Sequence, residues 1–304
     1  MVRGGLLHLA MGDDVSAEDE LHAGGRGGTQ EWNDEERGRE HPPTLAEGTG
    51  CFPMPAVSGR YRRAPVPPVG RLPYAAPVLY LALSCLQGRP MQAAAEDLLA
   101  LAPEGLQLTP GNAPTEGFED WLATGHVRTR THHGFHWHAL RQPVWSSEAD
   151  CLVPSDSVHP PRVREGEPVA QWRRKAEAGA FQGRTLETMY PGYVLGTGEE
   201  LEWAMDLGLR LAVDVSHLHI QQTAGVLSER TWRRLCEYAH IDELHVSLSD
   251  GQRDVHRPID ADTFGLGWVR ERLAAGSPVI LECYMHRLSE RERHQQLAVL
   301  RGSA

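Results

Sequence analysis

The chain has 304 residues, of which 40% are hydrophobic, so it can bury a large core as two ordinary domains or as one α/β barrel of about 250 residues. The formal net charge of −11 and a single lysine, Lys175, disfavour a nucleic-acid partner, because each phosphate contact needs a Lys or Arg. No apolar run is long enough to span a membrane, and the five cysteines form no C-x-x-C pair. We therefore expect a cytoplasmic protein with reduced cysteines.

The first 73 residues are rich in Gly, Glu, Arg and Pro and show neither a two-residue nor a 3.6-residue apolar period. We predict a disordered N-terminal extension over residues 1–73 and a folded domain over residues 74–304. A docking arm for a partner protein and an artefact of an upstream start codon are both open alternatives for the extension.

From Tyr74 onward, short apolar runs alternate with longer amphipathic stretches. The eight runs are 77–86, 104–111, 127–135, 150–159, 184–192, 210–220, 242–250 and 278–284. Helices are predicted over 90–102, 197–209 and 228–240, the last with Ser228 as its N-cap. Eight strands alternating with helices predict an α/β fold of the (β/α)₈ TIM-barrel type. A doubly wound open sheet is the alternative, but "SCLQGRPM" after the first run is a poor phosphate-binding turn.

Polar side chains follow the last six runs at or near the point where each strand is expected to end. They are His133, His159, Glu187, Asp214, His217, His245, Asp254, His256 and Glu282, with Asp254 and His256 in the loop after the seventh run. The carboxyl ends of barrel strands form the active site. A carboxylate buried there is costly unless it is paired or binds a cation, so we interpret these residues as a metal site.

The ligand types indicate which metals suit this site. Carboxylate oxygens and imidazole nitrogens suit Zn, Mn or Fe(II), and nine groups exceed what one ion holds, which indicates two or three ions. The choice of His133 over His132 is nearly even, and His132, His136, His138 and His219 are interpreted as bystanders. Each residue alone is as readily a salt-bridge partner or a core residue.

The order of these residues resembles that of the xylose isomerase-like TIM-barrel superfamily, which includes the endonuclease IV (AP endonuclease family 2) enzymes. The motifs that carry the resemblance are Glu187, Asp214-x-x-His217, His245, Asp254-x-His256 and Glu282. The resemblance implies that Glu187 bridges two ions. It also implies that Asp214 and Glu282 bind one ion and that Asp254 and His256 bind another.

Two further histidines, His133 and His159, resemble a pair that endonuclease IV-like members add to the one-metal isomerase pattern. Three branches of the superfamily then compete. A sugar isomerase or epimerase would hold one ion such as Mn through Glu187, Asp214, His245 and Glu282, while a carboxylate moves a proton. In any of the branches, Glu187 and Glu282 are the candidate catalytic residues. An endonuclease IV-like enzyme would use three zinc ions on a phosphodiester, which the acidic charge disfavours.

The third branch comprises multinuclear non-haem iron enzymes that use O₂ to oxidise peptides or small molecules, and "GEELEWAMDLGLRLAVDV" resembles it most. We take it as the leading interpretation, with iron favoured over zinc or manganese, although those enzymes usually have Asn where this chain has His217. Arg257, beside His256, is a candidate for binding a substrate anion, with a plain salt bridge as its alternative. An inert barrel scaffold is the non-enzyme alternative.

Overall fold

The structure is a computed structural model that describes residues 78–145, 151–163 and 167–303. The predicted extension and its boundary at residue 73 lie outside these ranges. None of the described helices is long and apolar enough to cross a membrane.

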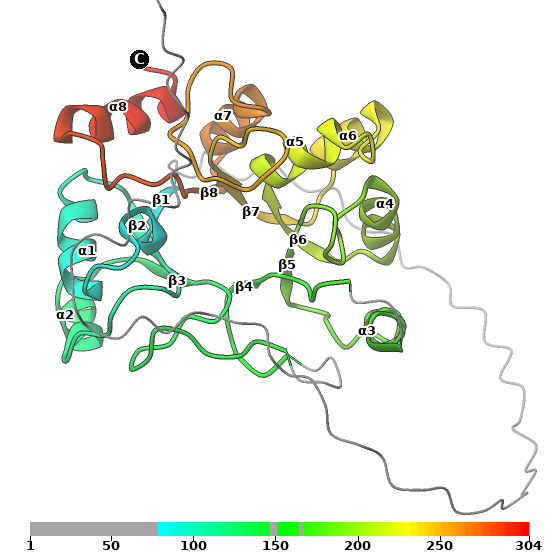
Figure 1. The fold of residues 1–304 in the computed structure, drawn as a ribbon, viewed down its shortest axis with the longest axis horizontal. Helices are drawn as coiled ribbons and strands as arrows, with labels where there is room; N and C mark the ends of the chain where they lie inside the picture. The colour runs from blue at the N-terminus through cyan, green and yellow to red at the C-terminus, as the bar shows by residue number, and fades with distance from the viewer. Residues whose placement is uncertain (1–77, 146–150, 164–166, 304) are drawn as a thin grey trace, which may run out of the picture. The chain divides into compact units, whose positions relative to one another are not determined.

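Eight parallel strands form one sheet in the order β3-β2-β1-β8-β7-β6-β5-β4 (Figure 1). Their bounds are β1 Val78–Ala82, β2 Gly105–Leu108, β3 Thr129–Thr131, β4 Ser157–Val158, β5 Thr185–Glu187, β6 Arg210–Asp214, β7 Ile241–Val246 and β8 Pro278–Leu281. A single parallel bridge between His132 and Ser157 joins the edges β3 and β4. The predicted (β/α)₈ barrel is therefore confirmed, and the open doubly wound sheet is excluded.

Helices follow most of the strands and cover the outside of the barrel (Figure 1). Their bounds are η2 Leu83–Leu86, α1 Met91–Leu99, α2 Phe118–Thr124, α3 Glu167–Glu177, α4 Gly198–Leu207, α5 Val215–Thr223, α6 Glu229–Cys236, α7 Leu266–Ala274 and α8 Glu290–Arg301. The predicted N-cap is confirmed, because the Ser228 side chain accepts a hydrogen bond from Thr231 N.

One predicted strand is shorter than its apolar run. The sequence suggested a continuous run over 210–220, but β6 ends at Asp214, whose side chain accepts hydrogen bonds from Ser216 N and His217 N. This N-cap satisfies backbone donors that a strand would have paired with its neighbour, so α5 begins at once. His217 consequently lies on the first turn of a helix rather than on a strand.

The connection from β3 to β4 contains no helix among its described residues. It is instead held by backbone pairs, such as Gln142 N to Gly134 O and Leu152 N to Val144 O, and by buried side chains of Phe135 and Val144. This irregular segment forms one side of the opening above the carboxyl ends of the strands.

Candidate metal centre

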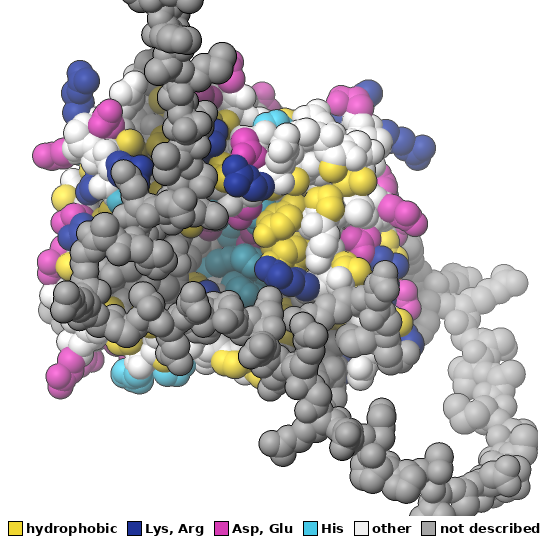
Figure 2. All heavy atoms as spheres, viewed as in Figure 1, with side chains coloured by type: hydrophobic (Ala, Val, Ile, Leu, Met, Phe, Trp, Pro, Cys, Tyr) yellow, Lys and Arg dark blue, Asp and Glu magenta, His cyan; other side chains and the backbone are white. Residues whose placement is uncertain are grey.

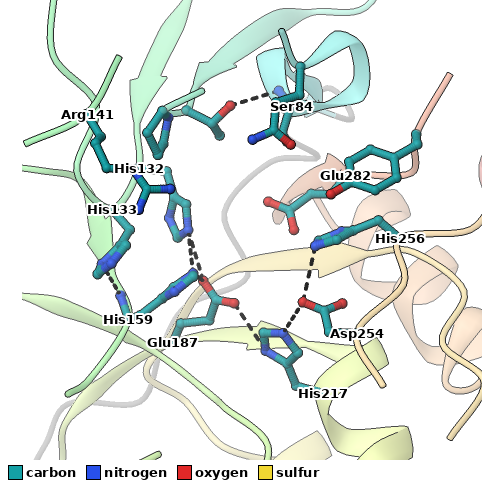
Figure 3. A pocket seen from close by; sticks show the side chains of 14 residues that line it. Ser84, His132, His133, Arg141, His159, Glu187, His217, Asp254, His256 and Glu282 are labelled. Atoms are coloured by element: carbon teal, nitrogen blue, oxygen red, sulfur yellow. Dashed lines mark hydrogen bonds and ion pairs between the residues drawn. The ribbon is translucent and has the colours of Figure 1, made fainter. Parts of the chain in front are cut away.

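A pocket of about 280 Å³ opens at the carboxyl ends of the strands (Figure 3). The histidines and carboxylates that line it are His132, His133, His159, Glu187, His217, Asp254, His256 and Glu282. Figure 2 shows histidine side chains recessed in this face of the molecule, beside hydrophobic and Lys or Arg side chains. Asp214 and His245 are fully buried beside them. The structure thus brings together the strand-end residues that the sequence singled out.

The first group, called site 1, comprises His132, His159 and Glu187. The Nε2 atoms of the two histidines are 2.9 Å apart and lie 3.2 and 3.3 Å from Glu187 Oε2. Ligands about 2.1 Å from one ion are separated by roughly 3.0 to 3.4 Å, so these three atoms have the spacing of a coordination sphere. Burial, assisted by His159 and His245, lowers the pKa of His132 well below its usual range, so this ring is neutral, as a ligand must be.

The second group, site 2, comprises Glu187, Asp214, His245 and Glu282. His245 Nδ1 lies 3.2 Å from Glu282 Oε1 and 3.4 Å from Glu187 Oε2. Its other nitrogen, Nε2, lies 3.0 Å from Glu243 Oε1 and donates to it, since an ionised carboxylate only accepts. Glu187 Oε2, Asp214 Oδ2 and His245 Nδ1 are buried and lack a hydrogen-bond partner among the described residues. Buried ligand atoms that lack a hydrogen-bond partner fit a divalent cation.

The electrostatics of site 2 favour a positive charge among its carboxylates. Burial by itself would lower the pKa of His245, but the charges of Glu282, Glu187 and Glu243 outweigh it and raise the pKa to about 10. Burial together with Glu187 and Asp214 raises the pKa of Glu282 to about 7. In the metal-free protein, protons therefore neutralise the carboxylates that an ion would otherwise neutralise.

The third group, site 3, comprises His217, Asp254 and His256. Both histidine Nε2 atoms lie 3.1 Å from Asp254 Oδ2. Dashed lines in Figure 3 mark these two contacts. His217 Nδ1 is 2.9 Å from Thr188 O and must donate to this carbonyl, so Nε2 is its free ligand atom. Nδ1 also lies 3.3 Å from Glu187 Oε1 but is not available as a ligand there. The backbone of His256 has a φ of 44°, a left-handed conformation that is costly for histidine.

Two predicted site residues, His133 and Arg257, belong to none of the three groups. His133 Nδ1 accepts a hydrogen bond from His159 N, and its ring stacks on that of His159 at 4.2 Å, outside the three groups. His132, interpreted from the sequence as a bystander, lies in site 1, and the role of His133 as a ligand stays a prediction. Arg257 is exposed and absent from the pocket lining, whereas Arg141 lines it. The role of Arg257 in binding a substrate anion stays a prediction.

Sequence reasoning missed the polar residues that lie beneath the ligands inside the barrel. Glu243 precedes His245 by two residues, and Arg130 precedes His132 by two, so each pair shares the inward face of its strand. This two-residue period was the available signal. It is clear on β7, where the intervening Leu244 is buried in the core, but not on β3, where Thr, Arg and His alternate and both faces are polar.

No family model and no curated protein sequence matches the chain. Among solved structures, a D-tagatose 3-epimerase-like protein matches with a TM-score of 0.53 and 12% identity over 74% of this chain and 96% of the other. At this identity the match shows the fold alone, which is the TIM barrel that the alternation of strands and helices predicted.

Two further structures match at lower TM-scores. The TTHB071 protein from Thermus thermophilus, soaked with ZnCl₂, has a TM-score of 0.43 and 17% identity over 75% of this chain and 97% of the other. A sugar phosphate isomerase/epimerase from Parabacteroides distasonis has a TM-score of 0.38 and 10% identity over 75% of this chain and 97% of the other. Both TM-scores are too low to support a conclusion about this chain.

Proposed function

We propose that the protein is a metal-dependent enzyme whose sites 1, 2 and 3 hold two or three divalent ions. The observation that carries the proposal is the direction of the histidine lone pairs. In each site, one ring nitrogen is committed to a protein partner, namely Ser157 Oγ for His132, Glu243 for His245 and Thr188 O for His217. The other nitrogen faces a carboxylate oxygen about 3 Å away. Two acceptors at this distance repel each other unless a proton or a metal ion lies between them.

Glu187 connects sites 1 and 2. Its Oε2 atom lies 3.2 to 3.4 Å from nitrogens of His132, His159 and His245. A centre with a single metal ion would not account for most of these contacts. We therefore assign Glu187 as the shared ligand and, with Glu282, as one of the two carboxylates that act in the reaction.

The leading proposal for the chemistry is the O₂-dependent oxidation of a peptide or a small molecule. Iron in these sites would supply redox chemistry, and any divalent ion would supply Lewis acidity. Sites 1 and 3 support this proposal, because they add five ligands to site 2. Hydrolysis of a nucleic acid is disfavoured by the net charge of −11.

An isomerase or epimerase that acts on a sugar or sugar phosphate is the second candidate. The observation that favours it is the fold match to a D-tagatose 3-epimerase-like protein. Site 2 alone, with Glu187, Asp214, His245 and Glu282, contains enough ligands for the single ion that such an enzyme would need. In this case sites 1 and 3 would bind substrate hydroxyls rather than metals.

Elemental analysis tests the proposal and separates the candidates. Protein produced in medium supplemented with Fe, Zn and Mn should contain two or three ions per chain. One ion per chain would favour the isomerase. A protein that binds no ion would support the inert-scaffold alternative. The variant His256→Ala should lose about one ion, whereas His219→Ala, whose ring stacks on Phe264 outside the three sites, should lose none. Iron-loaded protein should then consume O₂ with a Cys-containing peptide encoded near its gene, and it should not interconvert aldoses and ketoses.

A further inference from the structure

One wall of the pocket offers no ligand to a metal ion. The proposed ligands follow β3 to β8, whereas the segments after β1 and β2 line the same pocket without contributing one. The described residues that these two segments place in the pocket are Ser84, Gln87, Thr109 and Pro110. None of these four carries a carboxylate, an imidazole or a thiol, so this β1–β2 wall is available to a substrate that reaches the ions.

Main-chain hydrogen bonds through Gly111 hold the β1–β2 wall together. Gly88 N donates to Gly111 O at 3.0 Å, and Gly111 N donates to Leu140 O at 2.8 Å. The φ of Gly111 is 103°, a conformation that favours glycine. A Cβ atom on Gly111 would lie 2.4 Å from Gln87 Nε2, so the Gln87 side chain lies directly against this glycine. Glycine here both permits the turn and leaves the space that Gln87 fills.

Arg141, in the connection from β3 to β4, extends this wall. The carbonyl of the preceding residue accepts from Gly111 N, and the next residue, Gln142, donates from its backbone N to Gly134 O at 2.9 Å. The chain is therefore anchored on both sides of Arg141. Figure 3 shows Arg141 on the opposite side of the pocket from His256. Among the described residues that line the pocket, Arg141 is the one Lys or Arg side chain.

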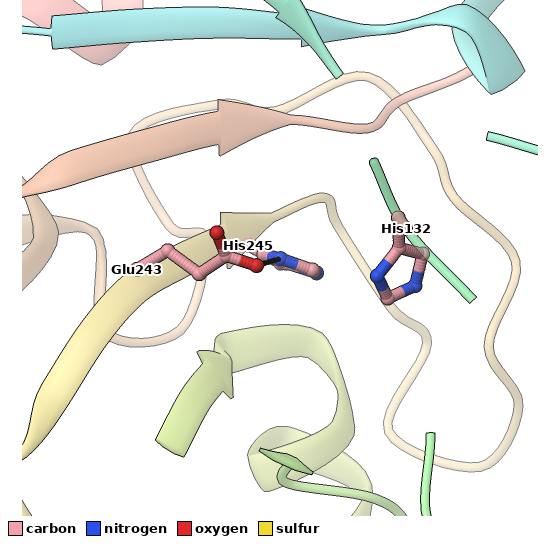
Figure 4. Close-up of side chains that lie close together, drawn as sticks. All are labelled: His132, Glu243 and His245. Atoms are coloured by element: carbon pink, nitrogen blue, oxygen red, sulfur yellow. Dashed lines mark hydrogen bonds and ion pairs between the residues drawn. The ribbon is translucent and has the colours of Figure 1, made fainter. Parts of the chain in front are cut away.

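Carboxylates occupy the other sides of the pocket. Glu187, Asp254 and Glu282 line it, and below them the fully buried Glu243 projects from β7 into the barrel (Figure 4). These carboxylates repel a negatively charged group, and ions bound among them reduce the repulsion mainly at the centre itself. The guanidinium of Arg141 attracts such a group and can donate two parallel hydrogen bonds to it. A negatively charged part of a substrate is therefore most stable at Arg141.

The polar groups of the β1–β2 wall can donate hydrogen bonds to the same anion. The Gln87 amide donates through Nε2. The Thr109 hydroxyl is buried and accepts from Ser84 N at 2.8 Å, so its own proton is left to donate. An ionised carboxylate or phosphate only accepts hydrogen bonds, and the described residues of this wall include no carboxylate that would repel it. The chemistry of the wall therefore matches an oxyanion.

We propose that Arg141, with Gln87 and Thr109, binds an oxyanion of the substrate, either a carboxylate or a phosphate, while the reacting part of the substrate faces the metal centre. The proposal assigns anion binding to the connection from β3 to β4 rather than to Arg257, which is exposed and absent from the pocket lining. It deepens the proposed function and rests on it, because it concerns the substrate of the same site.

Binding of inorganic phosphate and of acetate to the metal-loaded protein tests this subsite. Arg141→Gln removes the charge of an exposed side chain, so the fold and the metal content should not change, whereas the affinity for the anion should fall roughly 10-fold. Arg141→Lys keeps the charge but not the planar fork and should lose less. Arg233→Gln is the matched control, because Arg233 is also exposed but lies on α6, outside the pocket lining. Isothermal titration calorimetry at low ionic strength measures the affinities.

The two probes distinguish the two sources of the oxyanion. The anion whose affinity falls more in Arg141→Gln is the group that the subsite binds. Gln87→Ala should weaken the binding of the same anion by about 3-fold, since it removes a neutral donor rather than a charged one. Both anions can also bind the ions directly, but that contribution is the same in variants of equal metal content. The difference between the variants therefore reports the subsite alone.

The outcomes separate the subsite from the proposed function. A wild-type protein that binds no metal overturns the proposed function and this inference together. A wild-type protein that holds its ions but binds neither anion, or a variant Arg141→Gln that binds both anions as tightly as the wild type, overturns the subsite and leaves the proposed function intact. An equal loss in Arg233→Gln, or a loss confined to Arg257→Gln, would overturn the subsite as well.

Discussion

Two regions of the barrel differ in how firmly their strands are paired. β6 and β7 pair over four residues of each strand, whereas β3 and β4, with three and two residues, are joined by a single bridge. A long paired strand fixes which side chains point inward, because the alternation extends through several buried positions. A three-residue strand does not fix this direction. The orientation of the ligands in the first half of the barrel, His132 after β3 and His159 after β4, therefore depends on contacts that the sequence does not display.

The largest expected effect comes from removing the residue that joins the two halves. Glu187 on β5 contacts His132 and His159 from the first half and His245 from the second. Glu187→Gln should therefore lose at least two ions per chain and all activity, as measured by elemental analysis and turnover. Glu202→Gln, in a partly exposed pair with Arg234, is the control and should keep every ion. Retention of two or more ions in Glu187→Gln would mean that the halves bind metal independently.

A smaller effect distinguishes the two adjacent histidines after β3. His132→Ala should lose about one ion, because Nε2 of His132 lies within the spacing of site 1. His133→Ala should keep the full metal content, since His133 Nδ1 accepts a hydrogen bond from His159 N and the residue belongs to none of the three sites. The reverse outcome would restore the sequence-based assignment of His133 as the ligand.

This pair also shows what the sequence could and could not predict. The barrel, its eight strand positions and the carboxyl-end location of the second-half residues followed from periodicity, because each apolar run overlaps a strand of the observed sheet. His132 and His133 follow Thr-Arg-Thr, which has no apolar face to define the inward direction. The orientation of His132 depends on Ser157, 25 residues away, whose Oγ lies 2.9 Å from His132 Nδ1, and this long-range contact leaves no local pattern.

The pH dependence of stability should depend on metal content. Glu282, His256 and His245 have pKa values raised to about 7, 9 and 10 from ordinary values of 4.5, 6.5 and 6.5. The folded, metal-free protein thus binds more protons than the unfolded chain between pH 6.5 and 10. Stability supplied by the two histidines is fully present below pH 6.5 and is lost as the pH rises through their folded pKa values.

For the chelator-treated protein we expect the free energy of unfolding to fall by about 1.4 kcal/mol per pH unit for each such proton. Metal-loaded protein should show a much smaller slope, because ions replace the protons. Urea unfolding at about pH 6.5, 8 and 9.5, with and without a chelator, measures both slopes. Equal slopes would show that these groups do not share their site with a metal.

The smallest effect concerns a feature of the second half that the sequence did predict. The Ser228 side chain caps α6 by accepting from Thr231 N, so Ser228→Ala should destabilise the fold by about 1 kcal/mol and lower the Tm by roughly 2 to 4 °C. Because the cap is a local interaction remote from the ligands, the loss should be the same with and without metal, and metal content should not change. Ser228→Asn, which can also cap, should restore most of the stability. A loss that depends on metal would mean that the second half, too, is held by its ligands rather than by the local signals in its sequence.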